Sequence, residues 1–268
     1  MSSRDAVFSG SIPEIYDRLL VPLIFQPYAL DLAGRLPASR DILEVAAGTG
    51  VVTRALAARL ARDVRIVATD LNQPMVDYAA RRLGDDPRVE WRQADALALP
   101  FADARFDAVV CQFGAMFFPD RVRGYREARR VMRKTGRFLF NVWDRISENV
   151  FADAVTDSLA PFQPQNPPRF LARTPHGYHD ADRIRAELVE AGFVTISIDA
   201  VQEISRADTA RDVAVAYCHG TPLRNEIEAI DGLGLEAATQ AAVEELRRRF
   251  GDGPIEGPIK ALVIEAGV

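Results

Sequence analysis

A glycine-containing turn between a predicted strand and a predicted helix is the part of this sequence best suited to holding a ligand. An apolar run that begins at Asp41 contains one acidic residue, Glu44, and leads into Ala46-Ala47-Gly48-Thr49-Gly50. Small residues let a ligand approach the main chain closely, and the helix predicted over 51–62 begins with free N–H groups and the positive end of its dipole. The sequence therefore predicts a nucleotide-type pocket at this turn.

An aspartate follows at a spacing that suits the ribose of such a ligand. The β-branched apolar run over 64–69 ends in Asp70, and a carboxylate at a strand end can accept hydrogen bonds from both ribose hydroxyls. A dinucleotide site also needs a third small residue, in the pattern Gly-x-Gly-x-x-Gly, and this chain has Thr53 at that position. These residues favour an adenosine-bearing cofactor and leave NAD as an alternative.

Further motifs follow in a fixed order along the chain. Leu71 and Met75 come after the second predicted strand, Asp95 comes after the third, and the run 101–111 leads into the fourth. Together with Glu44 and the turn, this order resembles the class I, Rossmann-like S-adenosylmethionine-dependent methyltransferases. The resemblance covers residues 40–145 and is strongest to the branch of the ubiquinone/menaquinone C-methyltransferases and many small-molecule methyltransferases.

The resemblance implies how S-adenosylmethionine would be bound. Glu44 would orient the turn near the methionine amine, through main-chain amides or water, and Asp70 would hold the ribose hydroxyls. Leu71 and Met75 would enclose the adenine, and Asp95 would meet its edge. The full set of cofactor-binding residues expected on this basis is Tyr16, Glu44, Ala46, Gly48, Gly50, Asp70, Leu71, Met75, Asp95, Ala96 and Gln112.

The residues after the fourth predicted strand bear on the methyl acceptor. They read Gln112-Phe113-Gly114-Ala115-Met116-Phe117-Phe118 and lack the Asn/Asp-Pro-Pro-aromatic motif of enzymes that methylate exocyclic amines. Phe113 and Phe117 are expected to bind a flat or apolar small molecule. Three more phenylalanines can either extend that pocket or belong to the core: Phe151, Phe162 and Phe170.

No catalytic base is assigned from the sequence. His176, Tyr178 and His179 precede a predicted helix cap at Asp180, where packing is sufficient reason for them. His219 ends a predicted helix and can complement its dipole. Methyl transfer from a sulfonium depends mainly on orientation and on a dry site, so a base is optional.

Composition sets the broad class of the protein. The 268 residues carry a net charge of −5, which argues against a nucleic-acid partner because phosphate binding needs a basic surface. The basic stretch 121–137 fits one amphipathic helix with a solvated face. The two cysteines lack metal-ligand spacing, so no metal site is expected. No apolar run reaches the length of a membrane span, and a cytoplasmic protein is expected.

The strand and helix patterns predict an α/β fold of the class I methyltransferase type, a seven-stranded, mostly parallel, doubly wound sheet. The resemblance implies that the last strand runs antiparallel beside the fifth. The predicted strands are 41–46, 64–70, 88–94, 105–111, 136–143, 193–204 and 261–264. Helices are predicted over 13–20 and 22–36 before the sheet, from Asp180 to Ala191, and near 208–219 and 236–250.

A single domain with four parts is expected. Residues 1–38 form an N-terminal helical cover, 39–145 the cofactor-binding core, 146–179 an inserted lid or substrate segment without a regular pattern, and 180–268 the second half of the sheet with a helical insertion. The expected function is transfer of a methyl group from S-adenosylmethionine to a small, aromatic or hydrophobic molecule. The alternatives are an NAD-type oxidoreductase and a non-catalytic S-adenosylmethionine-binding module. The acceptor atom and the oligomeric state stay open.

Overall fold

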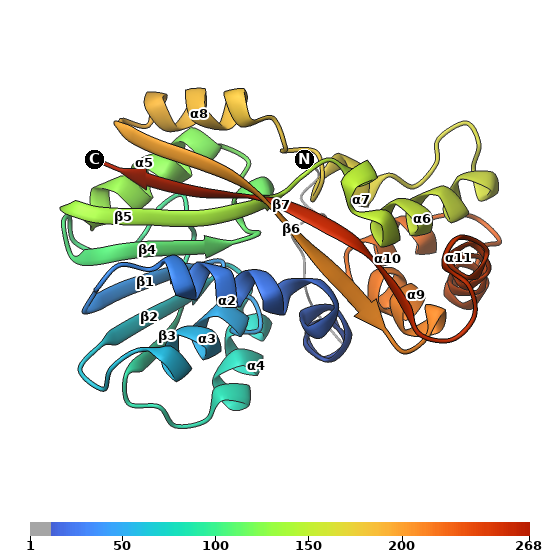
Figure 1. The fold of residues 1–268 in the computed structure, drawn as a ribbon, viewed down its shortest axis with the longest axis horizontal. Helices are drawn as coiled ribbons and strands as arrows, with labels where there is room; N and C mark the ends of the chain where they lie inside the picture. Colours follow the sequence, from blue (N-terminus) through green and yellow to red (C-terminus); the bar gives the residue numbers. More distant parts are fainter. Residues whose placement is uncertain (1–11) are drawn as a thin grey trace.

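The computed structural model describes residues 12–268 and contains a sheet of seven strands in the order β3-β2-β1-β4-β5-β7-β6 (Figure 1). β1 to β5 run parallel, and β7 is antiparallel to both of its neighbours, β5 and β6. This confirms the predicted sheet and its antiparallel last strand, while residues 1–11 of the predicted N-terminal cover lie outside the described part. The strands are β1 Asp41–Val45, β2 Arg65–Asp70, β3 Val89–Gln93, β4 Phe106–Gln112, β5 Met132–Trp143, β6 Thr195–Ala207 and β7 Ile255–Gly267.

The central strands are apolar because both of their faces are covered. Leu43 of β1 lies in register with Val67 of β2 and Val109 of β4, and all three side chains are buried. Strands buried on both faces need continuous apolar runs rather than alternation. This requirement explains why β1, β2 and β4 were readable in the sequence to within one or two residues.

Three helices connect the parallel strands and cover the sheet. They are α3 Val51–Arg59, α4 Gln73–Leu83 and α5 Arg121–Val131. The basic stretch predicted as one helix over 121–137 is helical only to Val131, because Met132 begins β5. The arginines of α5 contact the neighbouring helix α8 Ala181–Glu190: Arg121 pairs with Glu187 and Arg126 with Glu190.

The segment before β1 is one continuous helical rod rather than two helices. α1 Ile12–Ile15 passes into a π-type helix, η2 Tyr16–Phe25, and then into α2 Gln26–Arg35. A break was predicted near Pro22, but the wider π-helical turns, with hydrogen bonds five residues apart, continue past it. Tyr28 of α2 donates from its hydroxyl group to main-chain oxygens of β6 and β7, both at 3.1 Å.

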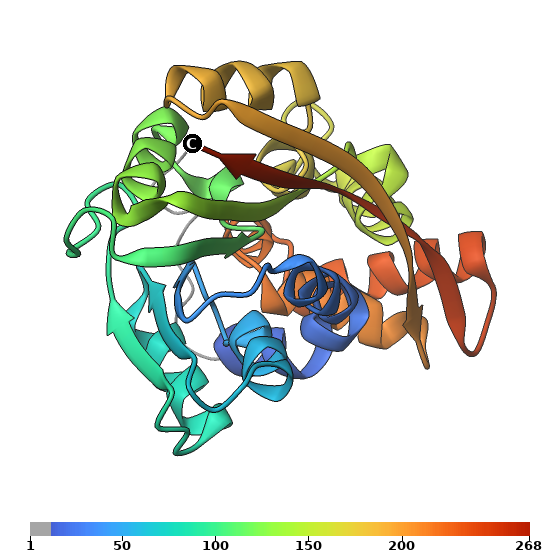
Figure 2. The ribbon, with the colours of Figure 1, turned by 60° about the vertical axis from the view of Figure 1, so that its left-hand side comes forward.

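A second group of helices lies beyond the end of the sheet, and we call it the helical lobe. It comprises α6 Val150–Leu159, α7 Phe170–Arg173, α9 Ala210–Gly220, α10 Leu223–Glu228 and α11 Leu235–Phe250. β6 and β7 pair along their whole length and extend from the sheet to this lobe (Figures 1 and 2). β7 therefore begins at Ile255, six residues before the predicted 261. The short 3₁₀ helices are η3 Ala115–Phe117, η4 Ile146–Glu148 and η5 Ala160–Phe162.

Helix α6 lies in the segment that was predicted to have no regular pattern. Its side chains Phe151, Val155 and Leu159 are fully buried, but no side chain caps its first turn. The preceding Asn149 is occupied elsewhere, because its amide donates to the carbonyls of Asp144, Arg145 and Lys260. A helix held by packing, without a cap, gives a weak signal in the sequence.

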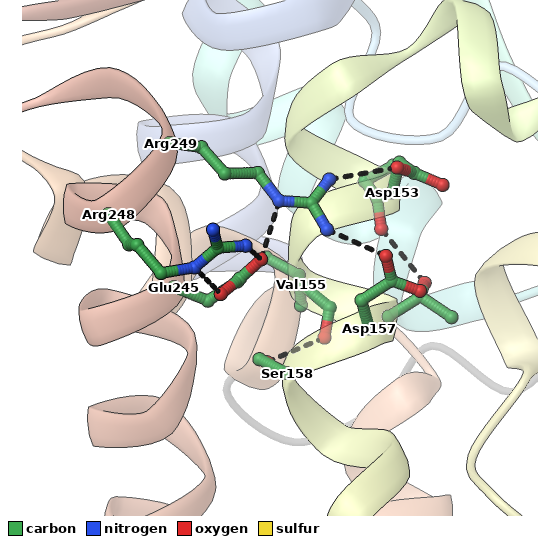
Figure 3. A network of polar contacts seen from close by, with 9 residues as sticks. Asp153, Val155, Asp157, Ser158, Glu245, Arg248 and Arg249 are labelled. Carbon is green, nitrogen blue, oxygen red and sulfur yellow. Dashed lines mark hydrogen bonds and ion pairs between the residues drawn. The ribbon is translucent and has the colours of Figure 1, made fainter.

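An arginine joins the two parts of the lobe that are distant in sequence. Figure 3 shows Arg249 of α11 between Asp153 and Asp157 of α6, at 2.9 and 2.6 Å. Glu245, one turn earlier on α11, accepts from both Arg248 and Arg249.

Among the helices of residues 12–268, none has both the length and the apolar character needed to cross a bilayer.

Candidate cofactor and acceptor site

The turn after β1 has left-handed backbone angles at three positions. The φ values are +55° at Ala46, +55° at Gly48 and +79° at Gly50. A Cβ atom on Gly50 would lie 2.7 Å from the ring of Trp91, whereas one on Gly48 would meet nothing within 4 Å. Gly50 is therefore required for packing against the protein, and Gly48 leaves open space for a ligand.

Asp70 holds this turn against the exit of β2. Its carboxylate accepts from the main-chain N–H of Gly48 at 2.9 Å and from that of Asn72 at 2.8 Å. Burial raises the pKa of Asp70 more than these hydrogen bonds lower it. The predicted ribose ligand Asp70 therefore also clamps the glycine-containing turn to the end of β2.

Glu44 is fully buried and is directed toward α3. Its carboxyl group accepts from the hydroxyl of Thr53 at 2.5 Å, and burial raises the pKa of Glu44 to about 8. Within the described residues its side chain bonds to Thr53, and to no main-chain amide of the turn. Its expected place near the methionine amine stays a prediction, while Thr53, which departs from the dinucleotide pattern, has a structural role here.

A cavity of about 130 Å³ lies at the carboxyl ends of β1, β2 and β4. Of the predicted site residues, Glu44 and Gly50 do not line it. The structure brings together the remaining ones, Tyr16, Ala46, Gly48, Asp70, Leu71, Met75, Asp95, Ala96, Gln112, Phe113 and Phe117. The sequence motifs therefore converge on one cavity although they are up to about a hundred residues apart.

The polar groups of this cavity fit a cation better than a pyrophosphate. Within the described chain, the charged residues that line it are Asp70 and Asp95, both acidic. Gln112 is buried, and its Oε1 atom has no hydrogen-bond partner among residues 12–268, while its Nε2 donates to the carbonyl of Phe25 at 3.2 Å. A buried acceptor without a partner is suited to an ammonium or sulfonium ligand.

A second, smaller cavity of about 60 Å³ adjoins the first. Tyr16, Phe113 and Phe117 line both. Phe113 has a φ of +50°, and its ring stacks on Trp143 with the ring centres 3.8 Å apart. A non-glycine residue held in this backbone region is a mark of a constrained site.

Sequence reasoning found part of this aromatic lining and missed the rest. Phe170 lines the second cavity, whereas Phe151 packs on Phe250 and Phe162 is 42% exposed. The residues that were missed as lining are Phe25, Trp143, His176 and Tyr217. Trp143 carries a usable signal, because it ends a buried strand next to β4. Tyr217 carries none, since it follows an ordinary apolar helix pattern.

Comparison with known proteins decides between the cofactors left open by the sequence. Residues 43–140 match a family model described as a methyltransferase domain. The chain is 33% identical over 168 residues, 59% of its own length and 67% of the other, to demethylmenaquinone methyltransferase of Clavibacter sepedonicus. The chain belongs to the class I S-adenosylmethionine-dependent methyltransferases.

Two other similar proteins agree with this assignment. The methyltransferase is 29% identical to a ubiquinone/menaquinone biosynthesis C-methyltransferase of Pseudomonas aeruginosa. The alignment of 199 residues spans 70% of this chain and 74% of that protein. Its fold is similar, with a TM-score of 0.60 and 15% identity, to phosphoethanolamine N-methyltransferase 2 of Haemonchus contortus in complex with S-adenosyl-L-methionine, over 100% of this chain and 60% of that one. The methyltransferase is an enzyme that uses S-adenosylmethionine, and the NAD alternative is wrong.

Proposed function

We propose that the methyltransferase methylates a flat, largely apolar small molecule. Its ring would lie in the second cavity, of about 60 Å³, which we call the aromatic cavity. The observation that carries this proposal is the shared lining of the two cavities by Tyr16, Phe113 and Phe117. A molecule in the aromatic cavity would contact the same three side chains as the cofactor. The curated relatives support it, because the named acceptors of those proteins are quinones, which are flat ring systems.

The first cavity, of about 130 Å³ at the strand ends, is called the cofactor cavity below. The residues around it would bind and orient S-adenosylmethionine. When bound, this cofactor supplies an electrophilic methyl group on a sulfonium. Asp70 would hold the ribose hydroxyls, Met75 and the half-exposed Leu71 would enclose the adenine, and the Oε1 atom of Gln112 would face the cationic end. Asp95 is already held in a turn, since its carboxylate accepts from the N–H of Leu97 at 2.9 Å.

The aromatic residues would exclude water and align the acceptor. Holding two reactants in line is worth several kcal/mol of the barrier, on the order of 7–11 in well-oriented systems. The aromatic cavity is smaller than the space of about 150 Å³ that accommodates benzene in another protein, so its lining must move apart as a ring enters. Phe170, Leu171 and His176 of the segment 146–179 line it, which supports the proposed role of that segment as a substrate lid.

Methyl transfer from radiolabelled S-adenosylmethionine to a panel of small molecules tests the proposal. We expect flat aromatic acceptors to be labelled and amines without a ring to stay unlabelled. A Trp143→Ala variant that still binds S-adenosylhomocysteine should lose at least tenfold in kcat/KM for the labelled acceptor. Labelling of aliphatic amines alone, unaffected by this substitution, would overturn the aromatic assignment.

Asp70→Ala tests the cofactor half of the proposal. We expect the affinity for S-adenosylhomocysteine to fall at least tenfold in calorimetry, because the ribose loses its acceptor and the Gly48 N–H loses its clamp. Asp95→Ala is the matched variant, with a carboxylate at the exposed edge of the same cavity, and its loss should be smaller. Unchanged affinity in a folded Asp70→Ala protein would refute the assigned role.

A further inference from the structure

One polar ring lies in the wall of the aromatic cavity, and the methyltransferase mechanism above does not use it. His176 follows α7, is 5% exposed, and lines the cavity together with Phe113 and Trp143. Its ring centre lies 5.9 Å from that of Trp143. A buried imidazole among aromatic side chains needs an account of both of its nitrogen atoms.

The first nitrogen fixes the tautomer of the ring. Nδ1 of His176 lies 2.8 Å from the main-chain carbonyl oxygen of Asp144. A carbonyl oxygen only accepts hydrogen bonds, so Nδ1 carries the hydrogen and donates it. In the neutral ring, Nε2 then carries a lone pair and is an acceptor.

The second nitrogen has no hydrogen-bond partner in the part of the chain that the structure describes. Within residues 12–268, Nε2 of His176 makes no hydrogen bond, whereas the neighbouring His179 directs its Nδ1 to the main-chain oxygen of His176. The polar edge of the His176 ring is thus an acceptor left for a molecule in the cavity that the ring lines. No residue among 12–268 donates a hydrogen bond to this acceptor, so a ligand that carries a donor can pair with it.

We propose that Nε2 of His176 is the hydrogen-bond acceptor that selects a ring-bound hydroxyl group on the methyl acceptor. The inference rests on the proposed function, because it names a recognition group of the same aromatic cavity. It makes His176 a specificity residue: a ring with a hydroxyl satisfies Nε2, and the same ring with a methyl group in that place leaves it unpaired. Sites that hydrogen-bond a hydroxyl reject analogues that lack it for this reason.

The basicity of the ring supports hydrogen bonding rather than proton removal. Burial lowers the pKa of His176 to about 4, against a smaller opposing effect of its bond to the Asp144 carbonyl. A phenolic hydroxyl has an ordinary pKa of about 10, so the proton stays on the bound hydroxyl. The charged and titratable groups around the ring are the Asp144 carboxylate, Lys260 at 3.6 Å from that carboxylate, and His179.

Nitrogen NMR tests directly whether Nδ1 of His176 carries the hydrogen and whether Nε2 is an acceptor without a hydrogen-bond partner. The chain contains three histidines, so ¹⁵N-histidine labelling of the whole protein with S-adenosylhomocysteine gives few signals, and His176→Asn identifies the relevant ones. We expect Nδ1 of His176 to be protonated at pH 7 and Nε2 to shift upfield with 4-fluorophenol but not with 4-fluorotoluene. A protonated Nε2, or an Nε2 signal that ignores 4-fluorophenol, would overturn the inference.

Binding of the same two probes tests selection. Fluorine NMR titrations with saturating S-adenosylhomocysteine should show roughly tenfold tighter binding of 4-fluorophenol than of 4-fluorotoluene, the effect of one buried hydrogen bond. His176→Asn keeps a donor for the Asp144 carbonyl but has no acceptor at the Nε2 position, so the preference should fall to about one. His176→Gln can restore an acceptor, and His179→Asn is the matched control that should keep the full preference.

The outcomes separate this inference from the proposed function. Equal binding of both probes to the wild-type protein would overturn the role of His176 and leave the aromatic acceptor site intact. Failure of both probes to bind, with S-adenosylhomocysteine bound normally, would overturn the aromatic acceptor site and this inference with it. If His176→Asn does not bind S-adenosylhomocysteine, the wild-type preference and the Nε2 shift alone decide.

Discussion

The two cavities of this methyltransferase are built in opposite ways. Most of the cofactor cavity is lined by residues that end a strand or directly follow one, at the carboxyl ends of β1, β2, β3 and β4. The aromatic cavity is formed by side chains from segments far apart in the chain, around 16–25, 113–117, 143, 170–176 and 217–222. A site made by strand ends is encoded locally, whereas a site made by facing helices exists only after the fold has formed.

The comparison predicts where mutations act on stability and where they act on a ligand. Substitutions in the turn after β1 and at the exits of β2 and β3 should change both the free energy of unfolding and the cofactor affinity, through main-chain geometry. Substitutions in the lobe should change stability without changing cofactor affinity.

Gly50→Ala should be the most damaging of these changes. The added Cβ would meet Trp91 at 2.7 Å in a residue whose φ is +79°, and strain plus overpacking should lower the free energy of unfolding by about 3 kcal/mol. Gly48→Ala, at a similar φ but with open space, should cost only about 1 kcal/mol. Its main effect should be at least a tenfold loss of S-adenosylhomocysteine affinity. Urea denaturation and calorimetry measure the two effects, and equal destabilisation by both variants would break the distinction between packing and ligand glycines.

Glu44 should make the free energy of unfolding depend on pH. Its pKa is raised to about 8 in the folded protein, so folding takes up a proton between the ordinary value of 4.5 and 8, and stability falls as pH rises through that window. Glu44→Gln mimics the protonated carboxyl and keeps a partner for Thr53. Between pH 5 and 7 the variant should gain on the order of 2 kcal/mol relative to the wild type. Urea denaturation at both pH values checks this, and parallel pH profiles would contradict it.

Asp17 tests the connection between the N-terminal rod and the cofactor half. Its side chain is 6% exposed and pairs with Arg54 of α3 at 2.8 Å and with Arg82 of α4 at 3.2 Å. Asp17→Asn leaves these arginines without a countercharge and should cost about 1–2 kcal/mol. Because Tyr16 is the next residue and lines both cavities, S-adenosylhomocysteine affinity should fall several-fold. Glu14→Gln on the same rod is the control, and an affinity change of equal size there would remove the special role of Asp17.

Arg249 tests the helical lobe by itself. Arg249→Met removes the contacts with Asp153 and Asp157 that join α11 to α6 (Figure 3), and the expected loss is about 1 kcal/mol. Arg247→Met removes only an exposed pair with Asp252 and should change stability by less than about 0.5 kcal/mol. Neither variant should alter S-adenosylhomocysteine affinity. A change in S-adenosylhomocysteine affinity in the Arg249→Met variant would show that the helical lobe and the cofactor cavity are coupled.

The same contrast explains which parts could be predicted from the sequence. The strand β1, the turn and Asp70 follow one another in the chain, so their chemistry and their spacing are visible together. The cap of α8 at Asp180, which accepts from the N–H groups of Asp182 and Arg183, was predicted for the same reason. Local patterns of this kind determine local geometry.

The remainder depended on contacts that no local pattern contains. Trp143 joins the site only because β5 pairs with β4 and brings it beneath Phe113. Helix α6 was missed because its start has no cap and its burial comes from distant helices. The hydrogen bond of Glu44 to Thr53 on the following helix was also not foreseen, and the predicted place of Glu44 near the methionine amine stays a prediction. Tertiary packing, not local propensity, determines each of these.

The long pairing of β6 with β7 has a consequence for how this enzyme can diverge. The two strands stay in register from Thr195 and Gly267 to Ala207 and Ile255, so the chain leaves the sheet and returns to it at adjacent points. Residues 208–254 are therefore an excursion with neighbouring ends, and a different folded segment could be grafted there without moving the core strands. Evolution, or a protein engineer, can exchange the part of the aromatic cavity wall that this segment supplies while the cavity at the strand ends keeps its shape.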